Sequence, residues 1–368
     1  MDKKLRIAGT LLGGAVGDAL GAPVEFMSRD RILDNYPPAG VCGYVDEDGL
    51  GRITDDTQMA LFTAEGVLRS GIQPLASDEP LSSPMRERLF RSMADSYRRW
   101  FLTQGRIGID ERFSAELLQS GWLISHRELF AERAPGMTCL SAIGDPRFGD
   151  RSAYPLNDSK GCGSVMRTAP IGLLLPPEIA FEVGCEASEL THCHLTGILA
   201  GGAMAMLIAE LLANRSLSDA VDMVLNRLAT EPDAEETSEA LENAVALADS
   251  PEAPATAIEQ LGGGWIAEEA LAIAVYCALK FENDFRGGVL AAVNITGDSD
   301  STGAIAGNIL GAALGIDAIP PEWLDALVER HIVAEMADDL AAFVADDFVP
   351  TEAFLKRYPI CEKLKIEN

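Results

Sequence analysis

The chain has 368 residues, of which 48% are hydrophobic, so it is long enough to bury a large core. Its 57 acidic and 29 basic residues give a formal net charge of −28, which argues against non-specific binding to nucleic acid or to an anionic membrane. Seven cysteines, an odd number without paired spacing, favour a reducing, cytoplasmic compartment over a disulfide-bonded secreted protein.

The chain carries no Ser/Gly-rich or Pro-rich linker, although its length alone would suggest two domains. We therefore expect one domain over residues 1–368. The basic residues Lys3, Lys4 and Arg6 before an apolar run resemble a short signal peptide, but Asp18 follows that run almost at once. No window of twenty apolar residues is free of charge, so we expect no membrane-spanning segment and no membrane partner.

The first predicted helix, over residues 3–21, has a glycine at every fourth position. A glycine costs a helix about 1 kcal/mol relative to alanine, so a stripe of them requires a compensating gain, such as close packing of helix backbones. The same stripe recurs late in the chain. The two stripes are Gly9, Gly13, Gly17 and Gly21, and Gly303, Gly307, Gly311 and Gly315. We expect the two helices to pack face to face, with two unrelated Gly-rich helices as the alternative.

A loop-like segment over 28–53 precedes a helix that opens with Thr54-Asp55-Asp56-Thr57 and stops at Gly71. Thr54 is a good N-cap, and early aspartates complement the helix dipole. Capping alone would therefore explain this motif.

The middle of the chain predicts helices over 86–104 and 120–133, followed by an irregular segment over 134–160. An irregular segment of that length is unusual in a compact domain and indicates a functional loop. The helix over 86–104 is amphipathic. Its arginines are expected to form a solvated face: Arg86, Arg88, Arg91, Arg98 and Arg99.

Three further motifs each allow a structural and a functional interpretation. Gly161–Arg167 offers backbone N–H groups at a helix start beside an arginine, which suits a phosphate but also an ordinary Gly-rich helix entrance. His192 and His194 lie too close in sequence to share a helix face, which is more typical of capping or core residues than of ligands. Trp265, after three glycines, is either a core aromatic residue or a stacking platform.

The remaining pattern is helical. Hardly any period-2 alternation occurs in the chain, so the predicted fold class is all-α. A short helix is expected after Arg167, ending before Pro176-Pro177. Further helices are expected at roughly 194–213, 216–229, 236–249, 265–280, 284–293, 321–329 and 331–346.

Two acidic clusters would meet if the striped helices pack: Thr54-Asp55-Asp56, and residues 298–301, which hold Asp298 and Asp300. They offer oxygen ligands only, which suit Mg²⁺, Mn²⁺ or Ca²⁺ rather than zinc. Their four aspartates are enough for two cations about 3.5–4 Å apart.

The motifs together resemble the ADP-ribosylglycohydrolases, the family that contains the ADP-ribosylarginine hydrolases and the dinitrogenase-reductase-activating glycohydrolases. No single motif is specific, but the ordered set is, and it extends from residue 9 to residue 315. The matching segments are GTLLGGAVGDALGAPVEF (9–26), ITDDTQMAL (53–61), KGCGSVMRTAPIGLL (160–174), THCHLTG (191–197), GGGWIAEEALA (262–272) and NITGDSDSTGAIAG (294–307).

The resemblance implies an all-α fold with two Mg²⁺ or Mn²⁺ ions in a cleft. One implied ligand group is Thr54, Asp55 and Asp56, and the other is Asp298, Asp300 and Ser301. Glu25 matches the acidic residue implicated in catalysis, and Asp56 and Asp300 are further catalytic candidates. The candidate substrate-binding residues are Gly163, Ser164, Val165, Met166, Arg167, His192, Trp265, Gly297 and Ser299.

The implied activity is metal-dependent hydrolysis of the N-glycosidic bond between ADP-ribose and a modified protein side chain. Arginine is the expected linkage because the GCGSVMR and Gly-Gly-Gly-Trp segments resemble the arginine-directed branch of the family. The expected partners are an ADP-ribosylated protein and ADP-ribose. The non-enzymatic alternative is an immunity or regulatory protein that binds a cognate ADP-ribosyltransferase toxin; the complete set of metal ligands favours hydrolysis.

Two other enzyme classes share part of the pattern. Asp298-Ser-Asp300-Ser-Thr302 fits the signature of haloacid-dehalogenase-type phosphatases, but that fold needs the motif at the end of a parallel strand. A terpenoid synthase is all-α with two acidic clusters, but it needs a DDxxD motif and an aromatic cavity. Asp55-Asp56-Thr57-Gln58-Met59 lacks the last aspartate, and only 6% of the chain is aromatic.

Overall fold

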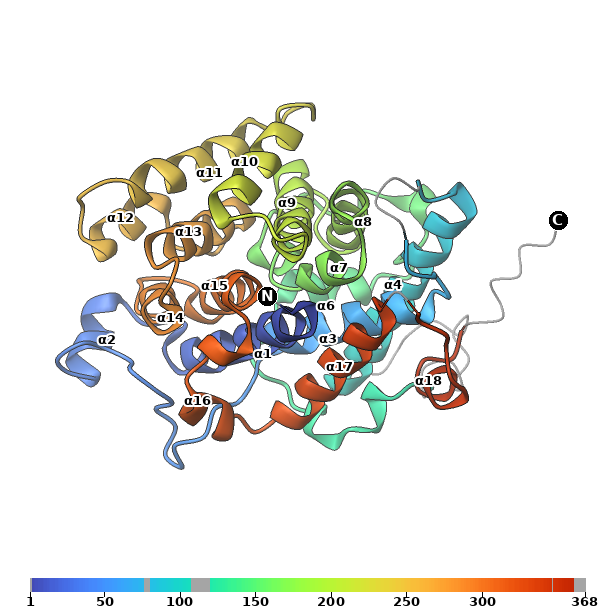
Figure 1. Cartoon of the computed structure of the whole chain (residues 1–368), viewed down its shortest axis with the longest axis horizontal. Coiled ribbons are helices and arrows are strands. Elements are labelled where there is room, and N and C mark those ends of the chain that lie inside the picture. The colour runs from blue at the N-terminus through green and yellow to red at the C-terminus, as the bar shows by residue number, and fades with distance from the viewer. Residues whose placement is uncertain (1, 76–79, 107–119, 346, 361–368) are drawn as a thin grey trace.

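The structure, a computed structural model, describes residues 2–75, 80–106, 120–345 and 347–360. Within these residues every regular element is a helix, and the only β-type pairings are two isolated bridges, Gly51 with Leu327 and Gly161 with Ile266. The all-α prediction is confirmed. Figure 1 shows α1 (Lys3–Gly21) and α15 (Ser299–Leu314) side by side in the middle of the molecule, with the other helices around them.

The two glycine stripes face each other, as predicted. A Cβ atom built on Gly13 would lie 2.4 Å from the carbonyl oxygen of Gly307, and one on Gly17 would lie 1.9 Å from that of Gly303. No side chain fits at such distances, so these glycines allow the two backbones to touch. The pair brings the beginning of the chain against residues near its end.

The other helices pack around this pair in groups (Figure 1). In one group α3 (Asp55–Arg69) packs against α4 (Ser83–Thr103), and α17 (Arg330–Phe343) packs against α1. In another, α9 (Leu195–Leu212) packs against α7 (Ala169–Leu174) and α8 (Pro177–Glu189). The third consists of α11 (Glu235–Ala248), α13 (Ala267–Lys280) and α14 (Phe285–Val293), of which the last two contact α15. Shorter or peripheral helices are α2 (Arg29–Asn35), α6 (Met137–Ile143), α10 (Leu217–Leu228), α12 (Pro254–Leu261), α16 (Pro321–Asp325) and α18 (Glu352–Arg357).

One hydrophobic cluster runs from Ile7 to Tyr358 and joins these groups into a single core. The segments Lys3–Val24 and Leu195–Leu212 are long and apolar enough to cross a membrane by composition, but most of each is buried in this core. Core helices of globular proteins satisfy the same criterion.

Several element predictions are wrong. The predicted helix over 120–133 is replaced by two short 3-10 turns, Leu123–Ser125 and Arg127–Leu129. Gly121 has a φ of +115° and His126, between the turns, is extended, so no helix can run through the segment. Conversely, the segments predicted to be irregular contain α2 and α6. Each has only seven residues, too few to show a helical period.

The predicted solvated arginine face of α4 is also partly wrong. Arg98 is 7% exposed and Arg99 only 1%. Arg99 donates from Nε to Glu65 Oε2 at 2.8 Å, and Glu65 lies on α3, against which α4 packs. The partner that makes burial of this charge favourable is 34 residues away in sequence.

Candidate active site

The site forms where the end of α1 meets the starts of α3 and α15. Glu25 follows α1 after a single 3-10 turn, Ala22–Val24. Asp55 and Asp56 occupy the first turn of α3. The glycine packing of α1 on α15 continues to Gly21, whose Cβ would lie 2.2 Å from the Ser299 carbonyl oxygen. Helix termini from both ends of the chain therefore meet at one place.

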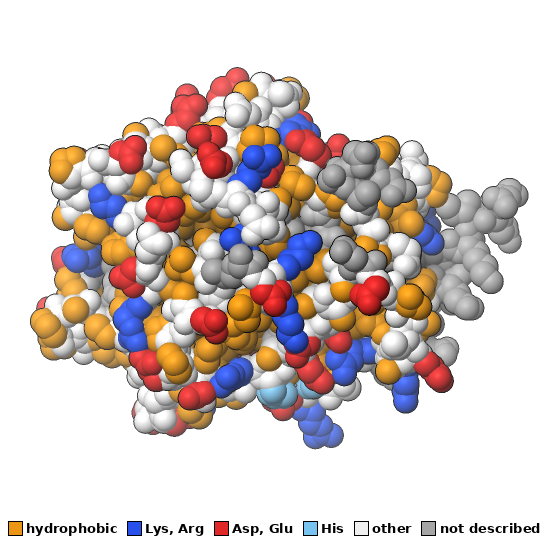
Figure 2. Space-filling model, viewed as in Figure 1, with side chains coloured by type: hydrophobic (Ala, Val, Ile, Leu, Met, Phe, Trp, Pro, Cys, Tyr) orange, Lys and Arg blue, Asp and Glu red, His pale blue; other side chains and the backbone are white. Residues whose placement is uncertain are grey.

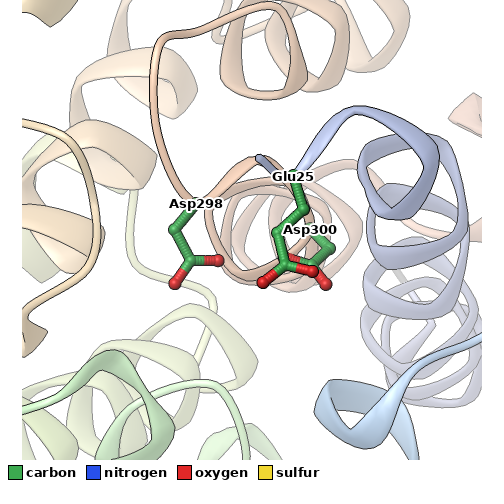
Figure 3. Close-up of side chains that lie close together, drawn as sticks. All are labelled: Glu25, Asp298 and Asp300. Carbon is green, nitrogen blue, oxygen red and sulfur yellow. The ribbon is translucent and has the colours of Figure 1, made fainter. Parts of the chain in front are cut away.

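Three carboxylates converge there. Glu25, Asp298 and Asp300 each have an oxygen within 4.8 Å of the others. Figure 3 shows Glu25 reaching from the segment after α1 toward the two aspartates at the start of α15. The predicted convergence of the two acidic clusters is present, because Asp55 and Asp56 line the same cleft of about 200 Å³. The other lining residues are Ala134, Gly136, Met137, Thr138, Cys139, Gly161, Cys162, Gly163, Met166, His192, Trp265 and Ser301.

The start of α3 is anchored by Asp18, a fully buried carboxylate on α1. Asp18 accepts from the Thr54 N–H at 2.9 Å and from the Thr54 hydroxyl at 2.8 Å. It also accepts from the Thr57 hydroxyl at 2.5 Å. Thr54 caps α3 as predicted, since its Oγ1 accepts from the Asp56 N–H at 3.3 Å. Asp18 thus fixes the helix that presents the first acidic pair.

Asp55 and Asp56 differ in their partners. Asp55 Oδ2 accepts from the Gly136 N–H at 3.0 Å, which ties α3 to the segment before α6. Asp56 Oδ1 is buried and has no hydrogen-bond partner in the described part of the chain. A buried carboxylate oxygen without a partner is costly, so this atom is suited to a ligand.

Burial and mutual repulsion raise the pKa values of the clustered carboxyls. The pKa of Glu25 rises to about 8, chiefly because of burial and then because of Asp298 and Asp55. Burial, partly offset by the Gly136 hydrogen bond, likewise raises the pKa of Asp55 to about 8. Burial and neighbouring carboxylates hold the pKa values of Asp56 and Asp300 well above the usual range. The cluster favours positive charge, either protons or cations.

The residues present fit divalent cations. They supply carboxylate and hydroxyl oxygens at the positive ends of two helices, an unpaired oxygen on Asp56, and mutual repulsion that a cation would relieve. Glu25 belongs to the same cluster, so it is close enough to act either on the substrate or on a bound cation.

Glycine-rich backbone also forms part of the cleft wall. The Cys162 N–H donates to the Trp265 carbonyl at 3.1 Å, and the Asp298 N–H donates to the Gly263 carbonyl at 2.8 Å. Trp265 lies at the rim and is 44% exposed, so it is no core residue, and its ring stacks on that of Phe26 at 5.6 Å. The glycine loop therefore joins Asp298 to an aromatic pair beside Glu25.

His192 is buried behind this wall and lines the cleft. Its Nδ1 lies 2.8 Å from the Thr191 hydroxyl, and burial holds its pKa well below the usual range. A Cβ on Gly163 would lie 3.0 Å from the His192 ring, so the histidine supports the glycine loop. His194, by contrast, caps α9, as its position suggested.

Other predicted residues lie further away. Arg167 is fully buried; it donates to the Ala187 carbonyl at 3.0 Å, and its guanidinium lies over the Tyr97 ring. Its side chain is thus engaged in the core rather than presented to a phosphate. Among the described residues, those predicted for the site that do not line the cleft are Thr54, Ser164, Val165, Arg167, Gly297 and Ser299.

Sequence reasoning missed several contributors to the site, among them Asp18, Cys162 and Met137. Asp18 could have been found, because a charge inside an otherwise apolar glycine-striped helix needs a buried partner. Cys162 is placed by the Gly161 bridge to Ile266, and its Sγ donates to Asp298 Oδ2 at 2.8 Å. Met137 at the rim is 75% exposed, and it comes from the segment predicted as a functional loop.

The fold and the cleft define an all-α protein with a carboxylate-lined site suited to divalent cations. The family model described as ADP-ribosylglycohydrolase matches residues 1–348, and the chain belongs to this family. It is therefore an enzyme of the hydrolase class, and the resemblance drawn from the motifs is confirmed.

Several proteins are similar in sequence to nearly the whole chain. An uncharacterized protein of Archaeoglobus fulgidus is 28% identical over 92% of this chain and 96% of its own. The ADP-ribosylarginine hydrolase Tri1 of Pseudomonas putida is 26% identical over 91% of this chain and 77% of its own. The ADP-ribosyl-[dinitrogen reductase] glycohydrolase of Rhodospirillum rubrum is 26% identical over 89% and 92%. A solved structure titled ADP-ribosylglycohydrolase-related protein complex has a TM-score of 0.63 at 25% identity, covering 93% of this chain and 99% of that one.

Proposed function

We propose that this protein is a divalent-metal-dependent hydrolase that releases ADP-ribose from a modified arginine side chain of a protein. The observation that carries the proposal is the convergence of Glu25, Asp298 and Asp300, with Asp55 and Asp56 in the same cleft. The rival phosphatase and terpenoid synthase classes do not fit the fold and family of this chain.

The chemistry needs stabilisation of positive charge on the ribose and control of one proton. Bound Mg²⁺ or Mn²⁺ would supply Lewis acidity toward the ribose hydroxyls and a water. Asp55, Asp56, Asp298 and Asp300 would hold these ions, with the Ser301 hydroxyl as a further oxygen ligand. Thr54, whose hydroxyl donates to Asp18 and caps α3, would position the two aspartates that follow it. Glu25, at the rim of the same cluster, is placed to handle the proton.

The remaining lining residues suit a nucleotide diphosphate ribose. Gly161 and Gly163 line the cleft without side chains, so a diphosphate can approach the backbone closely there. The Phe26–Trp265 pair at the rim offers a flat apolar surface for a planar group. Arginine as the acceptor is supported by the name of the Pseudomonas relative, which is an ADP-ribosylarginine hydrolase.

The test compares linkages and a variant that lacks one carboxylate. Chelator-treated protein is supplied with Mg²⁺ or Mn²⁺ and incubated with matched peptides that carry ADP-ribose on arginine or on serine, and free ADP-ribose is measured. We expect faster release from arginine and none without metal. Asp300→Asn, which retains the shape of the side chain, should abolish release and the metal-dependent rise in melting temperature while the helical circular dichroism persists.

Two outcomes would contradict the proposal. Faster release from serine would refute the arginine assignment. Undiminished hydrolysis by Asp300→Asn would refute the role of the carboxylate cluster.

A further inference from the structure

One thiol lies among the carboxylates of the cleft. Cys162 lines the cleft, and its Sγ lies 2.8 Å from Asp298 Oδ2 and 3.5 Å from Ser301 Oγ. Carboxylates and hydroxyls are hard ligands, whereas a thiolate is a soft one. The site therefore contains a soft ligand, the Cys162 thiol, in direct contact with a hard one, the Asp298 carboxylate.

A second observation shows that this part of the cleft is prepared for a cation. Asp56 lines the same cleft, is 3% exposed, and has Oδ1 without a hydrogen-bond partner. Asp298 also belongs to the cluster that includes Glu25 and Asp300. Carboxyl groups thus lie around the thiol, and a bound cation could be shared by the thiol and these oxygens.

We infer that Cys162 and Asp298 together bind a thiophilic divalent cation of the Zn²⁺ and Cd²⁺ class, in competition with the hard cations that the carboxylates would otherwise hold. As the metal–sulfur bond forms, the S–H bond breaks and its proton leaves to solvent. Asp298, which otherwise accepts the S–H, then becomes a shared ligand.

The consequence is that soft cations act as inhibitors. A cation held between Cys162 and Asp298 draws Asp298 away from the oxygen cluster that it forms with Glu25 and Asp300. This goes beyond the proposed hydrolysis, because binding is measured without any ADP-ribosylated substrate. The inference therefore survives or fails independently of the reaction.

The experiment is a Cd²⁺ titration of the reduced, chelator-treated full-length protein. It is followed by the ultraviolet sulfur-to-cadmium charge-transfer absorbance. Cys162→Ser is compared with Cys42→Ser, because Cys42 is exposed and outside the cleft, and each variant lacks one thiol. We expect Cys42→Ser to retain the tight binding of the wild type. Cys162→Ser should weaken Cd²⁺ binding by at least about 10-fold, since even groups that only support a metal ligand contribute 10–100-fold.

The Mg²⁺-dependent rise in melting temperature separates a ligand from a structural support. Serine still donates a hydrogen bond to Asp298 and is a hard ligand, so Cys162→Ser should keep the Mg²⁺ response of Cys42→Ser. Equal Cd²⁺ affinity of the two variants overturns the inference. A parallel loss of Cd²⁺ affinity and of the Mg²⁺ response overturns it too, because Cys162 then only positions Asp298. Asp298→Asn, which leaves the thiol in place, is a second test of the same site. It should weaken Cd²⁺ binding to a similar degree.

Discussion

At the scale of single residues, Glu25 differs from the other carboxylates of the cleft. The aspartates lie in the first turns of two helices, whereas Glu25 is carried by the 3-10 turn after α1 and lies beside the exposed Phe26. Its carboxylate is therefore held on a different element from the aspartates while lining the same cleft. This position favours a role in proton transfer over a role in holding the fold.

Glu25→Gln keeps the shape of the side chain but removes the base. We expect the turnover number to fall by about 10²–10⁴, the contribution of a general acid–base group. The Mg²⁺-dependent rise in melting temperature should change far less than in Asp300→Asn. Steady-state kinetics and thermal melts of the two variants check this. Normal turnover would exclude Glu25 from the chemistry, and a loss of Mg²⁺ stabilisation equal to that of Asp300→Asn would make it a metal ligand.

His192 gives a pH dependence with a definite sign. Burial, and then the nearby Arg167, hold its pKa below the ordinary value of 6.5, so the folded protein binds fewer protons than the unfolded chain below that pH. His192 therefore contributes to the stability of the folded protein at neutral pH, and this contribution is lost as the pH falls below about 6.5.

We expect His192→Gln to flatten the decline of the free energy of unfolding between pH 7 and pH 5 by up to about 1.4 kcal/mol per pH unit. Urea unfolding of wild type and variant over this range measures the difference. Parallel declines would show that His192 is protonated in the folded state.

At the scale of elements, the contact between α1 and α15 controls the geometry of the site. The closest approaches are backbone to backbone, from Gly9 against Gly311 to Gly21 against Ser299. Any side chain added along this line separates the two helices. Since Glu25 follows one helix and Asp298 begins the other, separation also opens the carboxylate cluster.

Gly13→Ala tests this contact away from the site itself. The new methyl group would meet the Gly307 carbonyl oxygen at 2.4 Å, so the variant should be less stable by at least the 1–3 kcal/mol typical of overpacking, despite the better helix propensity of alanine. Hydrolytic activity should fall with it. Gly43→Ala, whose nearest neighbour would be 3.7 Å away, is the control and should melt like the wild type. Equal melting temperatures of the two variants would contradict the account.

The features that could be predicted from the sequence are those with a strong local pattern. The glycine stripes, the cap of α3 by Thr54 and the convergence of the acidic clusters followed from local patterns and are confirmed. Elements of seven residues, α2 and α6, were missed because fewer than two turns show no period.

Long-range pairs were harder to foresee. The hydrophobic pattern of α4 indicates which face is apolar, but not that α3 places Glu65 against Arg99. Cys162 likewise meets Asp298 only through the fold, since 136 residues separate them. Such pairs depend on tertiary contacts that a single sequence does not encode locally.

At the scale of the whole molecule, the charge of −28 works against the proposed substrate. ADP-ribose carries a negatively charged diphosphate, and the acidic excess of the protein repels it at long range. Figure 2 shows acidic and basic side chains interspersed over the face in view, so on that face no broad basic patch attracts an anion. Cations bound in the cleft would make the electrostatic potential attractive to the diphosphate only within the cleft itself.

Raising NaCl from 50 to 300 mM at constant Mg²⁺ should therefore increase kcat/KM for an ADP-ribosyl-arginine peptide and leave kcat unchanged. The added salt shortens the screening length below the roughly 10 Å that holds at 0.1 M. Initial rates at low substrate concentration measure the effect, and KCl at equal ionic strength is the control. A fall in kcat/KM with either salt would show that attraction, not repulsion, governs encounter.

The pairing of α1 with α15 also bears on how the protein is made. α1 emerges from the ribosome roughly 280 residues before α15, which at 5–20 residues per second is a delay of about 15–55 s. Throughout that delay the apolar helix α1 lacks α15, the helix against which it packs in the folded protein. The nascent chain thus exposes an apolar helix until α15 has been synthesised, and the active site is assembled only when α15 covers that helix.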